Sequence, residues 1–285
     1  MTRYLITGAA GMLGQDLQRA LAGREVTALT RQDLDVTDAD AVRSAVAGHD
    51  VVINAAAYTA VDNAETDEDA AYAINATAVE HLAKAAAETG AKLVHYSTDY
   101  VFQGNAQAPY AENEQRDPLN AYGRTKAAGE ELALAAHPEG TFIVRTAWLY
   151  GAGGPNFAKT MVKLAENNPE ITVVNDQLGQ PTYTRDLAEQ TVKLLDAQAP
   201  AGIYHGTNSG ETTWFGFARE IFHLAGHDSE RVKPTDSAAF VLPAARPAYS
   251  VLGHDAWRAA GIEPMRNWRD ALEAAAEDGV LTSTW

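Results

Sequence analysis

Three glycines spaced three residues apart, Gly8, Gly11 and Gly14, lie between a short apolar run and an amphipathic segment near the start of the chain. The apolar run 3–7 predicts a strand, and the periodic segment 13–21 predicts a helix. In such a unit the first glycine permits a tight turn, the second lets a diphosphate approach the backbone, and the third allows close packing of helix on strand. The free N–H groups and the dipole of the helix start attract the diphosphate. The turn therefore predicts a dinucleotide-binding α/β domain.

The rest of the first half of the chain alternates between strand and helix patterns. Alternation at this spacing implies right-handed crossovers and a parallel sheet covered on both faces. The predicted fold class is α/β, with a Rossmann-type doubly wound parallel sheet. Strands are predicted at 25–29, 50–54, 92–97 and 141–145, and helices at 40–47, 65–88 and 121–136.

The alternation loosens after about residue 149. We predict a helix at 157–167, a strand at 170–174 and a helix at 186–197, followed by a segment rich in aromatic residues and prolines. Residues 1–150 are expected to form the NAD(P)-binding Rossmann domain, with part of 170–200 returning to it. Residues 151–285 are expected to form mainly a smaller C-terminal substrate-binding lobe, with the substrate between the two units.

Composition excludes several classes of function. The 22 Lys and Arg residues stand against 38 Asp and Glu, and the formal net charge of −16 argues against nucleic acid as a partner. Because the chain has no cysteine, it has no disulfide scaffold, thiolate zinc site or cysteine nucleophile. The first residues reach glycine too soon for a signal peptide, and no stretch approaches about 20 apolar residues. We expect a cytoplasmic protein with no membrane partner.

A Tyr-x-x-x-Lys spacing supplies a candidate acid/base. Tyr122 and Lys126 are four residues apart on a predicted helix, so they share a face. An ammonium beside a phenol is expected to lower the pKa of Tyr122 toward neutrality, which suits proton transfer at a carbonyl oxygen. The preceding strand ends in Tyr96-Ser97-Thr98-Asp99, where a hydroxyl is expected to face the same carbonyl.

The end of the second predicted strand bears on the choice of dinucleotide. An Asp or Glu there would bind the adenosine ribose hydroxyls and favour NAD, but this region reads Leu29-Thr30-Arg31. Arg31 can pair with a 2′-phosphate, which favours NADPH; an ordinary solvated cation is the alternative. Asp35 and Val36 are expected near the adenine, where Asp35 adds selectivity or caps a turn.

Six segments spread over nearly the full length carry a family resemblance: 52–62, 95–102, 118–123, 145–150, 156–161 and 246–247. Together they resemble the extended short-chain dehydrogenases/reductases that act on nucleotide sugars and, within them, the dTDP-4-dehydrorhamnose reductases. The resemblance implies reduction of the C4 ketone of dTDP-4-dehydro-β-L-rhamnose to dTDP-β-L-rhamnose, the last step of dTDP-rhamnose biosynthesis for cell-surface polysaccharide. With Arg31 at the end of the second strand, NADPH is the expected cofactor and NADH the alternative.

The resemblance also implies roles for single residues. Thr98 would take the hydroxyl role, Tyr122 would protonate the alkoxide, and Lys126 would hold the nicotinamide ribose. Asp99 would contact the sugar or adjust the pKa of the site. Trp148 would contact the substrate, with a place in the core as the alternative. The family more often has histidine where Tyr58 stands. The expected cofactor-binding residues are Gly8, Gly11, Met12, Leu13, Gly14, Thr30, Arg31, Asp35, Val36, Ala57, Tyr58, Thr59, Tyr122 and Lys126.

The diphosphate of the sugar nucleotide needs local cations in so acidic a protein. Asn156, Lys159 and Arg246 are the candidate ligands, with Arg246 preferred. Trp214 or Phe215 could pack on the thymine, but a place in the core between the two lobes is favoured.

Two further polar residues are left with open roles. Asn75 orders a proton-relay water or binds the backbone. Asp16 matches one carboxylate of an interface metal reported for some family members, but we predict no metal in the active site. A homodimer is left open.

Three other functions were weighed. A dTDP-glucose 4,6-dehydratase needs a second acid after Asp99, where this chain has Tyr100. A nucleotide-sugar 4-epimerase usually has an acidic residue at the end of the second strand. A non-catalytic regulatory subunit of methionine adenosyltransferase shares the fold, but the presence of Thr98, Tyr122 and Lys126 argues against a purely binding role.

Overall fold

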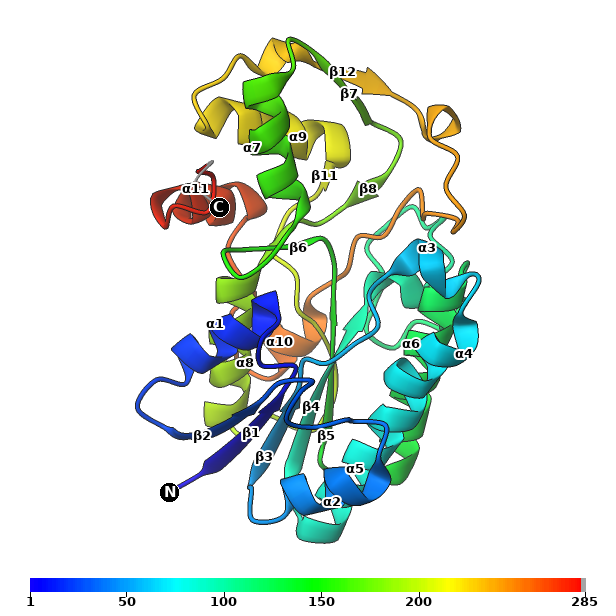
Figure 1. Cartoon of the computed structure of the whole chain (residues 1–285), viewed down its shortest axis with the longest axis vertical. Helices are drawn as coiled ribbons and strands as arrows, with labels where there is room; N and C mark the ends of the chain where they lie inside the picture. Colours follow the sequence, from blue (N-terminus) through cyan, green and yellow to red (C-terminus); the bar gives the residue numbers. More distant parts are fainter. Residues whose placement is uncertain (283–285) are drawn as a thin grey trace.

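A six-stranded parallel sheet forms the centre of the computed structural model, which describes residues 1–282 (Figure 1). Its strands are β1 (Arg3–Thr7), β2 (Glu25–Leu29), β3 (Val51–Asn54), β4 (Lys92–Thr98), β5 (Thr141–Thr146) and β10 (Gly202–His205). They follow the order β2-β1-β3-β4-β5-β10, and each neighbouring pair is parallel. The order reverses at β1, because β2 and β3 pair with its opposite edges. Ligands of open α/β sheets bind at such a point, beyond the carboxyl ends of the strands.

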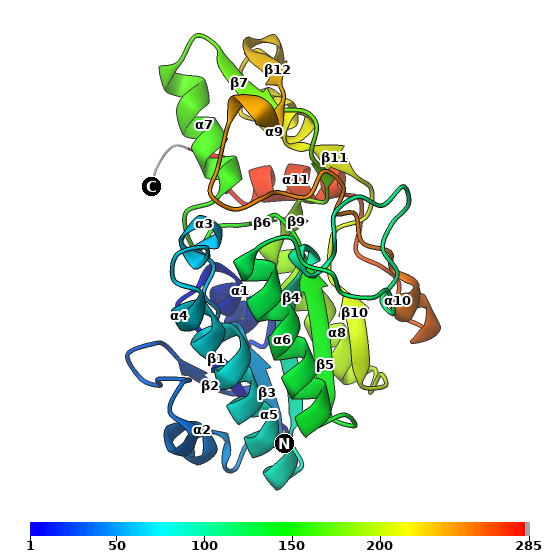
Figure 2. The same cartoon turned by 90° about the vertical axis from the view of Figure 1, so that its right-hand side faces the viewer.

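Helices cover both faces of the sheet (Figures 1 and 2). One face carries α1 (Met12–Ala20), α8 (Thr184–Asp196) and α10 (Asp255–Ala259), and the other carries α2 (Ala39–Val46), α5 (Ala78–Thr89) and α6 (Ala121–Ala136). Leu17 and Trp257 are buried in the first of these cores, and Val42 and Leu82 in the second. Central strands buried on both faces explain why the sequence shows short apolar runs rather than alternation.

A second unit lies over the carboxyl ends of the strands (Figure 1). Its core packs α7 (Phe157–Asn167), α9 (Trp214–Leu224) and α11 (Trp268–Glu277) around the buried Phe217 and Trp268. Three short pairs complete it: β7 (Ile171–Val174) with β12 (Val232–Thr235), β8 (Leu178–Gly179) with β11 (Thr212–Thr213), and β6 (Leu149–Tyr150) with β9 (Thr182–Tyr183). Between these elements the chain returns to the sheet, where α8 packs on α1 and β10 pairs with β5.

The alanine-rich segment 65–88, predicted as one helix, is divided. It comprises α4 (Glu68–Tyr72), the π-helical turn η1 (Ala73–Thr77) and α5, after the short α3 (Val61–Ala64). A π turn inserts an extra residue into the helix and often marks a functional region. Gly90 ends α5 in the left-handed conformation, φ 71°, as its position predicts.

The other predicted helices agree closely with the structure. α6 and α7 have the predicted bounds. α2 is capped by Asp38, whose carboxylate accepts hydrogen bonds from the N–H groups of Asp40 and Ala41 at 3.0 and 3.1 Å. Short 3₁₀ turns are η2 (Asp99–Val101), η3 (Ser229–Arg231) and η4 (Ser237–Ala239). Within residues 1–282 no helix is both long enough and apolar enough to cross a bilayer.

Candidate active site

The turn between β1 and α1 has the close packing that its glycines predict. Gly8 adopts φ +69°, and a Cβ there would lie 2.6 Å from backbone atoms of Ala55 and Ala56, just after β3. A Cβ on Gly14 would lie 2.3 Å from the Gly8 carbonyl oxygen. Neither position accepts a side chain unless the backbone moves.

The start of α1 presents backbone N–H donors that no side chain caps. Gly11 is its N-cap, no side chain caps the helix, and no acidic residue lies in its first turn. The N–H groups of residues 12–14 have no intrahelical acceptor, as in any first helical turn. Asp38, Asn120 and Asn156 cap α2, α6 and α7. An uncapped helix start at the point where the strand order reverses suits a diphosphate.

The loop after β2 holds the residues expected around the adenosine. The N–H and hydroxyl of Thr30 donate to the Asp33 carboxylate at 2.9 and 2.6 Å, and these bonds lower the pKa of Asp33. Asp35 accepts from the N–H and hydroxyl of Thr37, so it caps a turn. Arg31 is exposed, within Coulombic range of Asp35. An exposed guanidinium at this position is available to a phosphate.

Segment 57–59 follows β3 and is held by Asn75 from η1. Tyr58 N–H donates to Asn75 Oδ1 at 2.9 Å, and Asn75 Nδ2 donates to the Tyr58 carbonyl and the Thr125 hydroxyl, each at 3.1 Å. Of the two roles left open for Asn75, the structure shows the backbone-binding one. The π turn thus fixes the path of the segment beside the glycine turn.

Val36, in the loop after β2, packs partly against the core under α2.

Thr98, Asp99 and Tyr122 meet at the carboxyl end of β4. Thr98 Oγ1 donates to Asp99 Oδ1 at 3.0 Å and accepts from the Tyr100 N–H at 3.2 Å, and it lies near enough to the Tyr122 phenol to influence its pKa. Thr98 and Asp99 are buried, and the Tyr122 ring meets the edge of Tyr100 with centroids 6.0 Å apart. Asn120 caps α6 two residues before Tyr122 and so fixes where Tyr122 lies.

The predicted lowering of the Tyr122 pKa is not found. Burial, with the neighbouring Asp99 carboxylate, raises the pKa of Tyr122 to about 12, and the Thr98 hydroxyl opposes this only partly. Lys126 Nζ donates to the Tyr96 carbonyl at 2.6 Å and lies 3.2 Å from His95 Nε2. Burial also lowers the pKa of Lys126 to about 8. Because Lys126 donates to a backbone carbonyl and is partly deprotonated, it stabilises a Tyr122 phenolate only weakly.

Burial raises the pKa of Asp99 to about 6, against the partial stabilisation of its charge by Ser250 and Thr98. Between its unfolded pKa near 4 and this value the folded chain binds more protons than the unfolded chain, so the free energy of unfolding falls as pH rises. We expect Asp99→Asn to gain stability relative to the natural chain, on the order of 2 kcal/mol, between pH about 4 and 7. Urea unfolding of both proteins over this pH range measures the difference. If the free energies of unfolding of the two proteins changed in parallel with pH, the raised pKa of Asp99 would be contradicted.

Trp148 lies just after β5, where the chain enters the second unit. Its backbone adopts φ +46°, which is uncommon for a bulky residue and marks strain often found at binding sites. Its ring stacks on Trp214 with centroids 3.6 Å apart, and Trp214 in turn lies 4.6 Å from Phe157. Trp214 therefore packs within the second unit, and it also lines a cavity there.

Arg246 does not extend freely toward a ligand. Its guanidinium makes a two-point contact with the Asp62 carboxylate at 2.8 and 3.1 Å, and it donates to the Ala244 carbonyl at 2.7 Å. Asp62 lies in α3, so this ion pair joins the second unit to the sheet unit. Arg246 holds the pKa of Asp62 below its ordinary value.

Asn156 and Lys159 lie apart from Arg246. Asn156 caps α7 and donates to the Gly151 carbonyl at 2.8 Å, and Lys159 Nζ donates to the Ala152 carbonyl at 2.6 Å. Both line a cavity of about 830 Å³ that Gln15 also borders. Arg246 instead lines a cavity of about 550 Å³. The structure does not bring the three predicted diphosphate ligands to one place.

The 550 Å³ cavity lies beside the catalytic candidates. Tyr100, the edge-on neighbour of Tyr122, lines it together with Trp214 and Arg246. Its outer wall is the apolar segment 240–242, in which Val241 is 91% exposed. An apolar, aromatic cavity with one cation suits a nucleobase and a phosphate.

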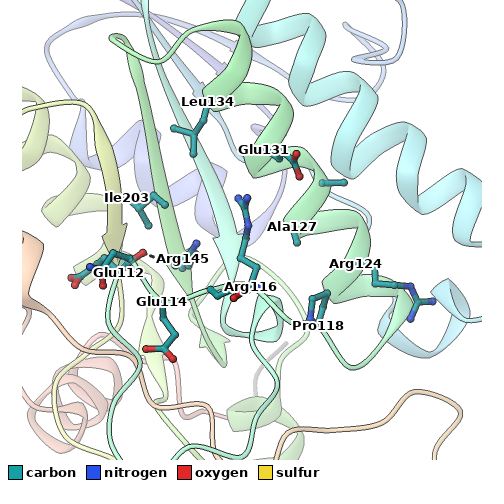
Figure 3. Close-up of a pocket in the computed structure, with 13 residues that line it drawn as sticks. Glu112, Glu114, Arg116, Pro118, Arg124, Ala127, Glu131, Leu134, Arg145 and Ile203 are labelled. Atoms are coloured by element: carbon teal, nitrogen blue, oxygen red, sulfur yellow. Dashed lines mark hydrogen bonds between the residues drawn. The ribbon is translucent and has the colours of Figure 1, made fainter.

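A third cavity, of about 600 Å³, lies on the other side of α6 (Figure 3). Arg145, Arg116 and Glu131 border it, and none of Thr98, Tyr122 and Lys126 does. The buried Arg145 is ion-paired with Glu130. This cavity is separate from the candidate active site.

The described part of the chain contains no group of three or more His, Asp or Glu side chains arranged to hold a metal ion. Asp16 is buried and its oxygens accept from Arg19 and Thr184, each at 2.6 Å.

A parallel sheet with a glycine turn at the reversal of strand order defines a Rossmann-type dinucleotide-binding protein. A family model described as the RmlD substrate binding domain matches residues 2–280. A dTDP-4-dehydrorhamnose reductase from Streptomyces griseus is 52% identical, over 95% of this chain and 91% of that one. A probable dTDP-4,6-dihydroxy-2-methyloxan-3-one 4-ketoreductase from Streptomyces antibioticus is also 52% identical, over 97% and 95%.

Solved structures agree. The crystal structure of dTDP-4-dehydrorhamnose reductase from Bacillus anthracis in complex with NADP is 41% identical and superposes with a TM-score of 0.94, over 98% of this chain and 100% of that one. The chain belongs to the dTDP-4-dehydrorhamnose reductase family.

Sequence reasoning missed several residues of this region. Asp62 pairs with Arg246 across 184 positions, and His95 contacts Lys126 from the strand beneath it. Segment 240–242 reads as an ordinary loop in the sequence. A signal existed for His95 alone, because a histidine inside an apolar buried strand requires a polar partner.

Proposed function

We propose that this protein reduces the C4 ketone of dTDP-4-dehydro-β-L-rhamnose to dTDP-β-L-rhamnose with NADPH, as a cytoplasmic enzyme of dTDP-rhamnose biosynthesis. The contact of Thr98 with Tyr122 at the carboxyl end of β4, beside the 550 Å³ cavity, carries the proposal. The relative from Streptomyces griseus, named a dTDP-4-dehydrorhamnose reductase, supports this substrate.

A phenol with a raised pKa suits reduction. At neutral pH Tyr122 stays protonated, and an alkoxide is a stronger base than its phenolate, so the proton moves to the sugar oxygen. Thr98 stabilises the charge that develops on that oxygen. The reduced nicotinamide supplies the hydride that adds to C4 of the sugar. One hydride and one proton convert the ketone to the alcohol.

The residues around the glycine turn fit a dinucleotide. A Cβ at Gly8 or Gly14 would collide with backbone, and the uncapped start of α1 offers donors to a diphosphate. We assign Thr30, Arg31, Asp35 and Val36 to the adenosine side, and 57–59, Tyr122 and Lys126 to the nicotinamide side. Residues 1–150 with the returning α8 and β10 hold the cofactor, and the rest of 151–285 holds the sugar nucleotide.

Adding a methyl group at Gly14 tests the cofactor site. We expect Gly14→Ala to weaken NADPH binding at least about tenfold and to destabilise the chain by about 1–3 kcal/mol, because its Cβ would overlap the Gly8 carbonyl. Fluorescence titration with NADPH and urea unfolding measure the two effects. Gly23→Ala, a turn glycine with open space around it, is the control and is expected to keep cofactor affinity. Equal affinity of both variants would contradict the site.

Arg31 sets the preference for NADPH in this proposal. Arg31→Ala is expected to raise the KM for NADPH about tenfold and to leave the KM for NADH unchanged, because only NADPH carries the 2′-phosphate. Arg43→Ala, another exposed arginine, is the control. A parallel change in both KM values would show that Arg31 does not read the 2′-phosphate.

On the substrate side we assign Asp99 and Trp148 to the sugar. Arg246 is assigned to the diphosphate, for which it would exchange Asp62 for a phosphate. Asn156 and Lys159 stay candidate contacts, reached only by a ligand that extends to the 830 Å³ cavity.

The test is a spectrophotometric assay of NADPH oxidation with enzymatically made dTDP-4-dehydrorhamnose, run in parallel with NADH. A second candidate function is the reduction of another dTDP-4-keto sugar. It is favoured by the relative from Streptomyces antibioticus, which is named a 4-ketoreductase of a different dTDP-sugar and is as similar to this chain as the relative from Streptomyces griseus. The same assay with that keto sugar separates the two. Stoichiometric bound NAD without net oxidation of NADPH would indicate an epimerase instead.

A further inference from the structure

Three polar side chains form a buried chain in the sheet unit below Tyr122. Asn54 ends β3, His95 lies beside it in β4, and Lys126 comes from α6; none is more than 2% exposed. Asn54 Nδ2 lies 3.0 Å from His95 Nδ1, and His95 Nε2 lies 3.2 Å from Lys126 Nζ. Each contact needs one donor and one acceptor, so together they restrict where the protons are.

The orientation of Asn54 is fixed from its other side. Its Oδ1 accepts from the Thr7 hydroxyl at 2.7 Å and from the Ala56 N–H at 3.1 Å. A backbone N–H only donates, so turning the amide over would place two donors against each other. Asn54 therefore directs its NH₂ group at His95, and Nδ1 of His95 must be the acceptor.

The proton of His95 follows from this. Burial lowers the pKa of His95 well below its ordinary value, so the ring is neutral and carries one N–H. Because Nδ1 accepts, that hydrogen is on Nε2 and faces Lys126 Nζ. An ammonium has only donors, whereas an amine has a lone pair. The contact is a hydrogen bond only when Lys126 is an amine, which still donates to the Tyr96 carbonyl.

We propose that His95 is a positioning residue that favours the neutral amine form of Lys126 in the cofactor-free protein. The other titratable group that acts on the Lys126 charge is Glu130, on its own helix, and Glu130 is ion-paired with Arg145 from β5. Burial also lowers the pKa of Lys126, and this favours the amine form as well. The consequence for catalysis rests on the proposed function: an amine leaves Tyr122 protonated as the donor to the sugar.

The tautomer of His95 gives the first test, on the full cofactor-free chain. The ¹⁵N shifts of the imidazole nitrogens distinguish the two tautomers, and the natural protein is expected to show His95 protonated at Nε2. In Asn54→Asp the carboxylate accepts from Nδ1–H, so the proton is expected to move to Nδ1. Protonation at Nδ1 in the natural protein would overturn the proposal without any variant.

The titration of Lys126 gives the second test. The chain has seven lysines, so ¹³C-labelled lysine side chains can be followed individually, with Lys126→Met identifying the signal. The natural midpoint is expected near pH 8. His95→Gln presents an oxygen that accepts from the ammonium and is expected to raise the midpoint by at least about one pH unit.

His205→Gln, which alters a buried histidine in contact with Arg145 instead, is the matched control and is expected to leave the midpoint in place. An unchanged midpoint in folded His95→Gln, or a natural midpoint near that of free lysine, would overturn the proposal. Neither readout requires turnover, so a shifted midpoint in a protein that fails to reduce the keto sugar would refute only the proposed function.

Discussion

Tyr122→Phe is expected to lower kcat for the keto sugar by about 10²–10⁴-fold with little change in NADPH affinity. The variant keeps the ring that packs against Tyr100 and loses the hydroxyl that contacts Thr98. A factor of 10³ corresponds to about 4 kcal/mol of transition-state stabilisation. Single-turnover measurement with saturating NADPH and sugar isolates the chemical step.

Tyr100→Phe is the matched control, because it removes a neighbouring phenol hydroxyl from the same region. We expect it to cost less than about tenfold in kcat. Near-natural turnover of Tyr122→Phe would refute the assignment of the proton donor. Equal losses in both variants would show that the effect is not specific to the Tyr122 hydroxyl.

Arg145→Met is expected to destabilise the chain by about 3–5 kcal/mol, because it leaves a buried carboxylate without its main partner. Arg145 Nε and Nη2 donate to the two oxygens of Glu130 at 2.9 and 2.7 Å, and both side chains are at most 1% exposed. Arg116, which is 28% exposed and lies 3.3 Å from Glu130, is a second ion-pair partner (Figure 3). Urea unfolding measures the loss.

Arg258→Met breaks an exposed pair with Asp255 and is expected to cost less than about 1 kcal/mol. Replacing Arg145 and Glu130 together with apolar residues is expected to recover part of the loss, since no unpaired charge then remains buried. A loss from Arg145→Met no larger than that of the exposed pair would contradict the account of this ion pair.

Local features of the fold were predictable because their causes lie close together in the sequence. The first strand, the glycine turn and the first helix lie within residues 3–20, and the bounds of α6 and α7 follow from local patterns. The division of 65–88 was not predictable in this way. It depends on Asn75 reaching the backbone of Tyr58, 17 positions away, which no local helix pattern reports.

The sequence by itself determined the α/β class, the dinucleotide turn and the presence of Thr98, Tyr122 and Lys126 at the ends of their elements, because strand and helix periodicity and glycine spacing are local properties. The tertiary structure decided the protonation and the partners of those side chains. Strand pairing sets Asn54 beside His95, α6 places Lys126 over them, and long-range packing pairs Arg246 with Asp62. A pKa depends on burial and on neighbouring charges, and both arise only when distant segments pack together.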